Sequence, residues 1–562
     1  MMKKMAAIIL SVVTVFSATG CSMLQGTFFL MKMRQDAATE EARIMEPGNG
    51  GKTGLEMSMD ADEMVGGEWE VYECEAYMPE MPQPQWNTEE YKYVAENGWL
   101  SSITSPFSTF AADVDTASYA NVRRMILEGQ TVPADAVRIE EMINYFDYHY
   151  PAPKGDEPFS VTTKIAPCPW NEDTQLFMIG LKAKEIKSED RGEKGSNLVF
   201  LIDVSGSMDE YNKLPLVQRA FRLLINELDA HDRVSIVTYA SEDRVVLDGA
   251  DGSEKTLIQD AVEDLLAGGG TNGSDGIVTA YELAQKHFIE GGNNRVILAT
   301  DGDLNIGLTD EGSLTRLIEE KAQSGVYLSV LGFGEGNISD TNMEALADHG
   351  NGNYSYIDNI SEARKVLVNE SGSTLFTVAK DVKLQVEFNP ARVKGYRLIG
   401  YENRTMAAES FADDTKDGGE IGSGHTVTAL YEIAPVGSGM EIPAAEGRYT
   451  NAGEEQGEQT GQAGQADEWG VVHIRYKEPD EDESILIDTI VRDNAVLDGM
   501  DDDLSWAAGV AQAGMILKGS EYAGTTDLGE VRERLKVLTD NDEFREEFVY
   551  LLGRMSSNTI DG

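Results

Sequence analysis

One stretch decides the fold: Asn197-Leu-Val-Phe-Leu-Ile-Asp203-Val-Ser205-Gly-Ser207. Its apolar run has neither helical nor alternating spacing, which predicts a strand buried on both faces, as in the centre of a parallel sheet. The run then stops in an acid, two hydroxyls and a glycine that permits a tight turn. In an open α/β sheet, ligands bind beyond the carboxyl ends of the strands. We expect these oxygens to share one spot there, where oxygen-only ligation favours a hard cation, magnesium rather than zinc.

Around this stretch, residues 196–376 alternate strand and helix throughout. Such alternation predicts right-handed crossovers and a doubly wound, mostly parallel sheet with helices on both faces. The short 244–247 element directly follows another strand, so an antiparallel edge hairpin is the alternative for it. We expect strands at 197–203, 233–240, 244–247, 295–300, 326–332 and 353–357, and helices at 213–228, 254–266, 275–290, 313–323, 340–348 and 361–370.

Two smaller modules are expected on either side of this central domain. Residues 105–195 contain strand and helix patterns, which predict an α+β module. Residues 377–555 contain strand patterns followed by three amphipathic helices, which predict a β-rich module with terminal helices. Within it, residues 437–468 are rich in Gly, Gln and Glu, and this composition favours a disordered loop.

The N-terminal residues are expected to be a targeting signal rather than part of the fold. Residues 1–21 combine two lysines, a short apolar run and small residues ending in Cys21, which is typical of a bacterial lipoprotein signal peptide with Cys21 as the lipidated residue. An ordinary signal peptide with a chance cysteine is the alternative. Lipidation would anchor the chain to the outer face of a membrane of the cell envelope. Residues 22–104 are acidic and Met-rich without a persistent apolar period, and we expect a flexible stalk.

The composition limits the partners and the chemistry. Acidic residues outnumber basic ones 98 to 46, giving a net charge of −52, which argues against nucleic acid and favours attraction of cations. The six histidines are far apart and predict no zinc cluster, and no phosphate-binding loop motif for a nucleotide is present. Cys74 and Cys168 are the remaining cysteines, and whether they pair after export stays open.

Two further turns of the central domain end in oxygen ligands. The loop Gly268-Gly-Gly-Thr271 places a hydroxyl before a predicted helix, and the strand Arg295-Val-Ile-Leu-Ala-Thr-Asp301-Gly ends in an acid. D-x-S-x-S, a Thr on a glycine loop and a strand ending in T-D-G together resemble the metal-ion-dependent adhesion site of von Willebrand factor type A domains. The resemblance extends over residues 107–555 to bacterial secreted proteins and lipoproteins with such a domain, and it implies a site of Asp203, Ser205, Ser207, Thr271 and Asp301.

The resemblance also implies a mechanism. The three hydroxyls and two carboxylates would bind Mg²⁺, with Mn²⁺ or Ca²⁺ as substitutes, directly or through water. Neutral hydroxyls leave the ion short of negative charge, so a Glu or Asp carboxylate of a partner protein would complete its coordination. We therefore expect a non-enzymatic, envelope-anchored binding protein with a role in adhesion or surface assembly.

Two alternatives come from other classes of protein. Asp113-Val-Asp115 after a strand resembles the motif of magnesium-dependent aspartate-nucleophile phosphatases, in which a carboxylate attacks phosphorus. Helix capping is the simpler explanation of these two acids, and the motif's later lysine and acid are not placed on an alternating fold. A subunit of an ATP-driven remodelling machine is the other alternative, which export would exclude because the envelope exterior lacks ATP.

Overall fold

The computed structural model describes residues 89–112, 115–155, 157–186, 194–271, 273–302, 311–372, 376–416, 418–443, 466–479, 481 and 483–558. All of them belong to one compact unit, residues 87–562. Several predictions lie outside these ranges: the signal peptide with Cys21, Cys74, most of the stalk predicted at 22–104 and most of the loop 437–468. The last residues of the predicted stalk are folded instead, because Leu100–Ser101 pairs with Gly395–Tyr396 and Glu90 forms a bridge to Ser339. No helix within the ranges is long and apolar enough to cross a membrane.

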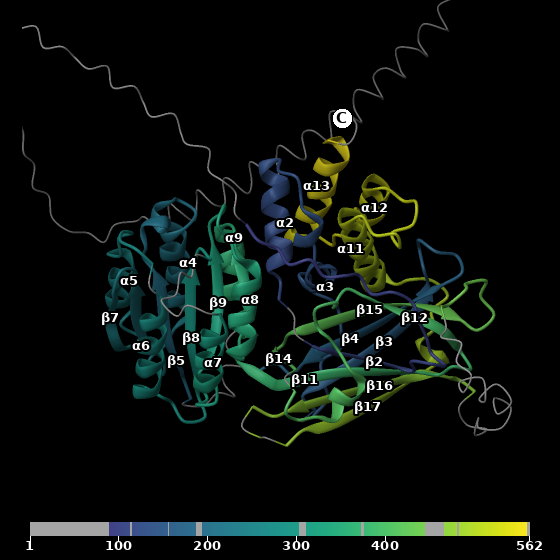
Figure 1. Ribbon diagram of the computed structural model, residues 1–562, viewed down its shortest axis with the longest axis horizontal. Coiled ribbons are helices and arrows are strands. Elements are labelled where there is room, and N and C mark those ends of the chain that lie inside the picture. The colour runs from purple at the N-terminus through teal and green to yellow at the C-terminus, as the bar shows by residue number, and fades with distance from the viewer. Residues whose placement is uncertain are drawn as a thin grey trace, which may run out of the picture. The chain divides into compact units, whose positions relative to one another are not determined.

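The central domain is built on a six-stranded sheet in the order β10-β9-β8-β5-β6-β7 (Figure 1). The strands from β10 to β6 are parallel, and β7 pairs with β6 in the antiparallel direction, so the hairpin alternative is correct for it. The predicted doubly wound, mostly parallel sheet is confirmed. Its strands are β5 (Ser196–Asp203), β6 (Arg233–Tyr239), β7 (Asp243–Asp251), β8 (Asn293–Thr300), β9 (Tyr327–Phe333) and β10 (Tyr354–Ile357).

Helices cover both faces of this sheet. The apolar side chains of β5 point alternately to the two faces, and each face packs against helices in its own core. Leu198, Phe200 and Ile202 face the core that contains α4, α5 and α9, whereas Val199 and Leu201 face the core that contains α6, α7 and α8. The helix expected at 361–370 is α9 followed by a π-helical turn, η4. These elements are α4 (Leu214–Glu227), α5 (Lys255–Glu263), α6 (Gly273–Lys286), α7 (Glu311–Ala322), α8 (Asp340–His349), α9 (Ile360–Arg364) and η4 (Lys365–Asn369).

The remaining strands of the described chain form a β-sandwich. One sheet has the order β1-β12-β15-β4-β3 and the other the order β13-β2-β11-β16-β17, with β14 paired to β11. A core rich in aromatic side chains, such as Phe177, Phe388 and Tyr431, fills the space between the sheets. The strands are β1 (Leu100–Ser101), β2 (Phe107–Ala111), β3 (Phe159–Pro167), β4 (Gln175–Ala183), β11 (Thr377–Phe388), β12 (Val393–Ile399), β13 (Thr405–Met406), β14 (Gly419–Gly422), β15 (Thr426–Pro435), β16 (Glu468–Lys477) and β17 (Ile485–Arg492).

Both sheets mix strands from the two ends of the chain, because β2 pairs with β11 and β4 pairs with β15. The central domain is therefore inserted between the halves of one sandwich. A layer of helices covers the sheet that contains β15 and β4 (Figure 1), and buried Met142, Trp506 and Phe548 belong to its core. The helices of the layer are α2 (Ala117–Glu128), α3 (Ile139–Asn144), α11 (Asp502–Lys518), α12 (Leu528–Leu535) and α13 (Glu543–Asn558).

Buried ion pairs join the central domain to this helical layer. Arg123 on α2 is 2% exposed and contacts Asp358 and Glu362 of the central domain together with Glu547 of α13. Arg138, beside α3, reaches Asp340 of α8 at 2.9 Å. Ala117 and Ala120 of α2 belong to the same core as α6 and α8, so α2 packs as an additional helix of the central domain.

Candidate metal centre

The topology brings two of the three predicted turns together. Strand β5 has β6 on one side and β8 on the other, so the chain reverses its winding between β5 and β8. In such sheets this reversal opens a crevice at the carboxyl ends of the two strands. Ile202 pairs with Ala299, which places Asp203 and Thr300 side by side at the ends of the strands. Asp203 and Asp301 therefore follow neighbouring strands at one edge of the sheet.

The first turn folds back on its own acid. The Ser205 N–H donates a hydrogen bond to Asp203 Oδ1 at 2.8 Å, and the hydroxyls of Ser205 and Ser207 lie 3.0 Å apart. Asp203 and Ser205 are buried, whereas Ser207 is half-buried. Alternate residues of this turn thus direct three oxygen-bearing side chains toward the same region.

Backbone hydrogen bonds tie the loop that carries Thr271 to this first turn. Gly206 N donates to Gly269 O at 3.1 Å, and Gly268 N donates to Val204 O at 2.8 Å. Gly269 has a φ of +90°, a conformation that favours glycine. Thr271 itself is half-buried and lies two residues before the start of α6 at Gly273. The second predicted turn is therefore held against the first by the backbone alone.

Asp301 is completely buried and lies against a lysine that the sequence did not single out. Lys213 Nζ is 3.0 Å from Asp301 Oδ2 and 3.2 Å from Asn337 Oδ1, and Lys213 is also buried. Burial by itself would raise the pKa of Asp301, but the Lys213 charge and hydrogen bonds from Asn337, Lys213 and Ser207 hold this pKa below its ordinary value. The hydrogen bond from Ser207 links the first turn to the third.

Asp203 is the carboxylate that lacks a counter-charge. Its Oδ2 is buried and has no hydrogen-bond partner among the described residues. Burial, with a smaller contribution from the charge of Asp301, raises the pKa of Asp203 to about 6, although hydrogen bonds from Ser205 and from the Tyr239 hydroxyl oppose the shift. An unpaired buried carboxylate oxygen is costly, and a cation in front of it would remove that cost.

The donor set is one that fits a hard divalent cation. Two carboxylates and three hydroxyls supply only oxygen, which suits Mg²⁺ better than zinc. No cluster of three or more His, Cys, Asp or Glu side chains suited to a metal occurs within the described ranges. The predicted set of Asp203, Ser205, Ser207, Thr271 and Asp301 contains only two acids, so it is not a group of that kind.

The structure describes one of the two acids of the phosphatase alternative. Asp113 lies outside the described residues. Asp115 is buried, accepts a hydrogen bond from Tyr354 N at 2.8 Å and lies 3.1 Å from Arg404. It thus ties the helical layer to the edge strand β10 of the central domain. Asp115 is therefore engaged in structural contacts, and the phosphatase alternative is not favoured.

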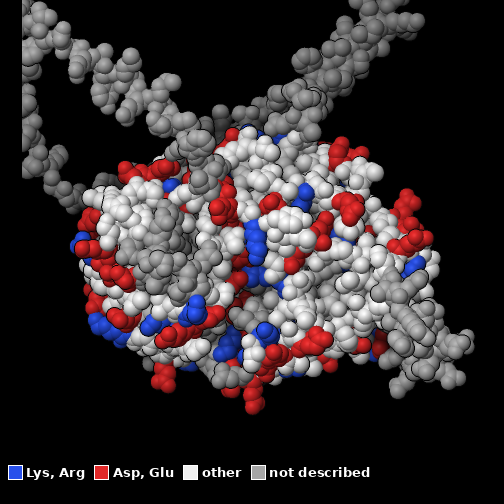
Figure 2. All heavy atoms as spheres, viewed as in Figure 1, with Lys and Arg blue, Asp and Glu red and all other residues white. Residues whose placement is uncertain are grey.

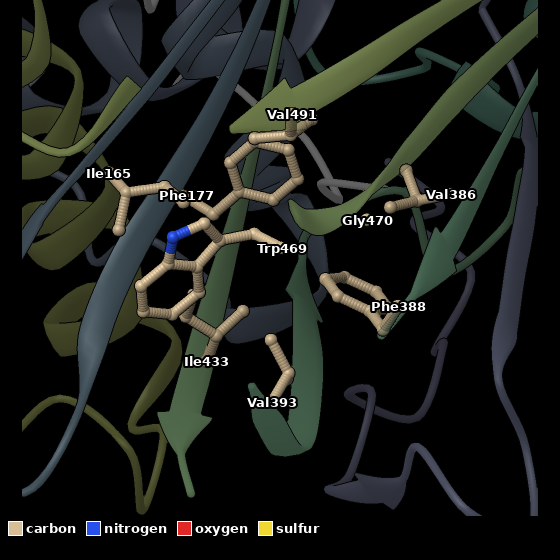
Figure 3. Close-up of a pocket in the computed structure, with 9 residues that line it drawn as sticks. All are labelled: Ile165, Phe177, Val386, Phe388, Val393, Ile433, Trp469, Gly470 and Val491. Atoms are coloured by element: carbon tan, nitrogen blue, oxygen red, sulfur yellow. The ribbon is translucent and has the colours of Figure 1, made fainter. Parts of the chain in front are cut away.

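Two cavities away from the predicted site offer little to a ligand. One, inside the sandwich between Trp469, Phe177 and Ile433 (Figure 3), measures about 10 Å³, which is room for about one water molecule. The other, of about 620 Å³, is lined by both the central domain and the sandwich. There Lys365 is paired with Glu370, and Lys182 donates to Gly424 O at 2.6 Å.

Figure 2 shows acidic side chains spread over one face of the molecule, with several basic side chains around a central hollow.

Three family models together match most of the described chain. The model of the von Willebrand factor type A domain matches residues 197–369, a model described as von Willebrand factor matches residues 85–178, and a model described as uncharacterized protein YfbK, C-terminal, matches residues 373–557. Uncharacterized protein YfbK of Escherichia coli is 41% identical over 475 residues, which cover 83% of this chain and 80% of the relative.

Two more distant matches cover smaller or less similar parts. Uncharacterized protein sll0103 of a Synechocystis strain is 32% identical over 30% of this chain and 39% of its own length. A solved von Willebrand factor type A structure from Catenulispora acidiphila is 17% identical, with a TM-score of 0.39 over 72% of this chain and 91% of that chain. The Escherichia coli protein is 41% identical over 83% of this chain and 80% of its own length. The chain therefore belongs to the YfbK family and carries a von Willebrand factor type A domain at its centre.

Proposed function

We propose that this protein binds one divalent cation, Mg²⁺ in the first instance, at the carboxyl edge of the central sheet and uses it to recognise a partner protein. The ligands are Asp203, Ser205, Ser207, Thr271 and Asp301, directly or through water. The observation that carries the proposal is the buried, unpartnered Oδ2 of Asp203 beside the paired hydroxyls of Ser205 and Ser207. A bound ion supplies a positive charge that an external carboxylate can share.

The chemistry of the partner follows from the balance of charge. Lys213 already neutralises Asp301, so Asp203 is the one proposed carboxylate ligand without a counter-charge in the described structure. A divalent ion held mainly by neutral hydroxyls therefore keeps net positive charge and favours an anionic ligand. Ser207 and Thr271 are only half-buried, whereas Asp203 is buried, so the ion would be reached from the side of these two hydroxyls. A Glu or Asp side chain of a partner protein fits this approach, in keeping with adhesion or surface assembly and with no catalytic step.

Calorimetry with Mg²⁺ tests the metal site. The unmodified chain should bind one ion, and Asp203→Asn should abolish the binding because it removes the unpaired carboxylate. Asp209→Asn is the matched control, since Asp209 is an exposed acid on the same turn and its removal changes the net charge equally. Equal affinity for Mg²⁺ in the unmodified chain and in Asp203→Asn would overturn the proposal.

Recognition of a partner is tested separately. The unmodified chain and Asp203→Asn serve as baits for envelope proteins of the native cell, each with Mg²⁺ and with a chelator. A partner held through the ion is retained only by the unmodified chain in Mg²⁺. A partner retained equally under all four conditions would contradict recognition through the ion, whatever the calorimetry shows.

We also propose that the mature protein is anchored by a lipid on Cys21 after removal of residues 1–20, on the outer face of a membrane. The sequence of residues 1–21 supports this proposal. Cys21→Ser should move the protein from the membrane fraction to the soluble fraction of the envelope. An unchanged distribution, with no lipid mass on the N-terminal peptide of the unmodified protein, would refute the anchor.

A further inference from the structure

The described chain begins beside the proposed metal site. Glu90 pairs with Ser339 in an isolated parallel β-bridge, and Glu90 N donates to Ile338 O at 3.0 Å. Gly336 N donates to Glu89 Oε1 at 2.9 Å. Residues 89–91, which we name the strap, therefore lie against the loop 334–339 that follows β9.

The loop 334–339 in turn contacts the ligand Asp301 through two routes. Asn337 Oδ1 accepts a hydrogen bond from Lys213 Nζ, which also binds Asp301. Gly302, the residue after Asp301, packs directly on the loop: a Cβ at this position would lie 2.8 Å from Ser339 N. No side chain fits between these backbones, so a shift of the loop is transmitted to Asp301 and its lysine.

A buried arginine fixes the strap to the helical layer. Arg124 of α2 is 2.9 Å from Glu89, and the side chains are 5% and 3% exposed. Arg124 also lies 3.6 Å from Glu335 in the loop. One guanidinium thus contacts both the strap and the loop, and burial gives these contacts more weight than exposed ion pairs have.

We infer that the strap positions the proposed metal site, with Glu89 as the positioning residue that holds the loop 334–339 in place for divalent-cation binding. While the loop is held, the Lys213 ammonium is shared between Asp301 and Asn337. When the strap is released, Asn337 leaves both Lys213 and Asp301. The Lys213 ammonium then has Asp301 as its main acceptor and competes more strongly with the cation. Loss of the strap therefore weakens cation binding. This inference rests on the proposed function and names the element that controls its affinity.

The test compares Mg²⁺ affinity in single variants of the full chain. Glu89→Ala should weaken Mg²⁺ binding at least fivefold in calorimetry. Glu96→Ala is the matched control, because Glu96 lies seven residues further along the same segment and binds Ser520 and Arg397 instead. Glu89→Gln, which keeps an acceptor for the Gly336 amide, should recover part of the loss. Equal affinities in Glu89→Ala and the unmodified chain would overturn the inference.

A second readout follows from the reciprocity of coupled binding. If the strap strengthens Mg²⁺ binding, Mg²⁺ must strengthen docking of the strap by the same factor. Hydrogen exchange of peptides covering 89–91 and 334–339 should therefore slow on addition of Mg²⁺ in the unmodified chain and remain unchanged in Asp203→Asn.

A double variant separates the route through Lys213. In the Lys213→Met background, the loss of Mg²⁺ affinity caused by Glu89→Ala should be smaller, since the competing ammonium is gone. No Mg²⁺ binding by the unmodified chain refutes the proposed function itself, whereas normal binding without slowed exchange refutes the strap alone.

Discussion

The Lys213 ammonium lies 3.0 Å from Asp301 Oδ2, and neither side chain reaches solvent. The positive charge of Lys213 thus neutralises Asp301, one of the two predicted acidic ligands. The other acid, Asp203, has a carboxylate oxygen without a hydrogen-bond partner in the described structure. The proposed site therefore has one carboxylate paired with an ammonium and one buried carboxylate without a counter-charge. This asymmetry separates the two acids: Asp301 is neutralised by the protein, and Asp203 is the acid that a bound ion would neutralise.

Replacing Lys213 by Met should strengthen Mg²⁺ binding and destabilise the metal-free protein. The methionine keeps the apolar stem but removes a positive charge that repels the ion, and two unit charges 4 Å apart interact by about 4 kcal/mol at an effective dielectric constant of about 20. We expect at least a tenfold gain in affinity, which corresponds to about 1.4 kcal/mol. The metal-free protein should lose about 3 kcal/mol of unfolding free energy because Asp301 stays buried without its partner.

Calorimetry and chemical denaturation measure the two effects of Lys213→Met. Lys286→Met is the control, since Lys286 pairs with Asp248 at an exposed position where the loss should stay below about 1 kcal/mol. Weaker Mg²⁺ binding in Lys213→Met would show that the lysine supports the ion rather than competing with it.

The sequence singled out the proposed ligands of the site but not the residues that contact them. Asp203, Ser205 and Ser207 follow one buried strand within five residues, so their convergence is a local property. Lys213 is 88 residues from Asp301 and Asn337 is 124 residues from Lys213. A lysine before an apolar helix ordinarily faces water, and nothing in its neighbourhood indicates burial.

The same distinction holds for the fold. The central domain was predictable because most of its strands are followed in the chain by a neighbour in the sheet, with the step from β7 to β8 as the exception. The sandwich was predicted as two separate modules, whereas β2 and β11 pair through residues such as Thr109 and Gln385, 276 positions apart. No periodicity within either half specifies a partner at that separation. Strand β17 was not predicted at all, although it completes the sheet beside β16.

Arg123→Met should destabilise the whole described unit rather than one part of it. Arg123 contacts the carboxylates of Asp358, Glu362 and Glu547 and lies over the Tyr119 and Tyr145 rings. Its removal leaves three buried carboxylates facing one another, and breaking one buried pair alone costs about 3–5 kcal/mol. Urea denaturation should show a loss of at least this size in one transition. Arg222→Met, at the exposed pair with Glu263, should change stability by less than about 1 kcal/mol.

The pH dependence of stability should report on Glu141 at the joint between α3 and α8. Burial first, and then the charges of Asp340 and Glu344, raise the pKa of Glu141 to about 8 despite the nearby Arg138. The folded state therefore binds a proton that the unfolded chain releases near its ordinary pKa of about 4.3. This group contributes stability at low pH that is lost as the pH rises toward 8.

Glu141→Gln removes that proton uptake while keeping an acceptor for the Ser118 amide. Thermal unfolding between pH 5 and pH 8.5 should show the variant gaining on the unmodified protein as the pH rises, with a constant difference above pH 8. Glu227→Gln, at an exposed position, corrects for the change in net charge. A difference that is flat across this range would contradict a protonated Glu141 in the folded protein.

A fragment of residues 196–376, the boundaries that the sequence predicts for the central domain, should fail to fold cooperatively by itself. It lacks Ala117 and Ala120 of α2, which complete one of the two cores, and it leaves Asp340, Asp358 and Glu362 without their arginines. The edge strand β10 also loses the acceptor that Asp115 gives to Tyr354 N. Circular dichroism during urea denaturation should show a shallow transition at a lower midpoint than the full chain. Residues 89–558, which retain these contacts, should unfold with the same urea midpoint as the full chain. If the fragment 196–376 had that midpoint too, the inserted domain would be energetically independent of the sandwich.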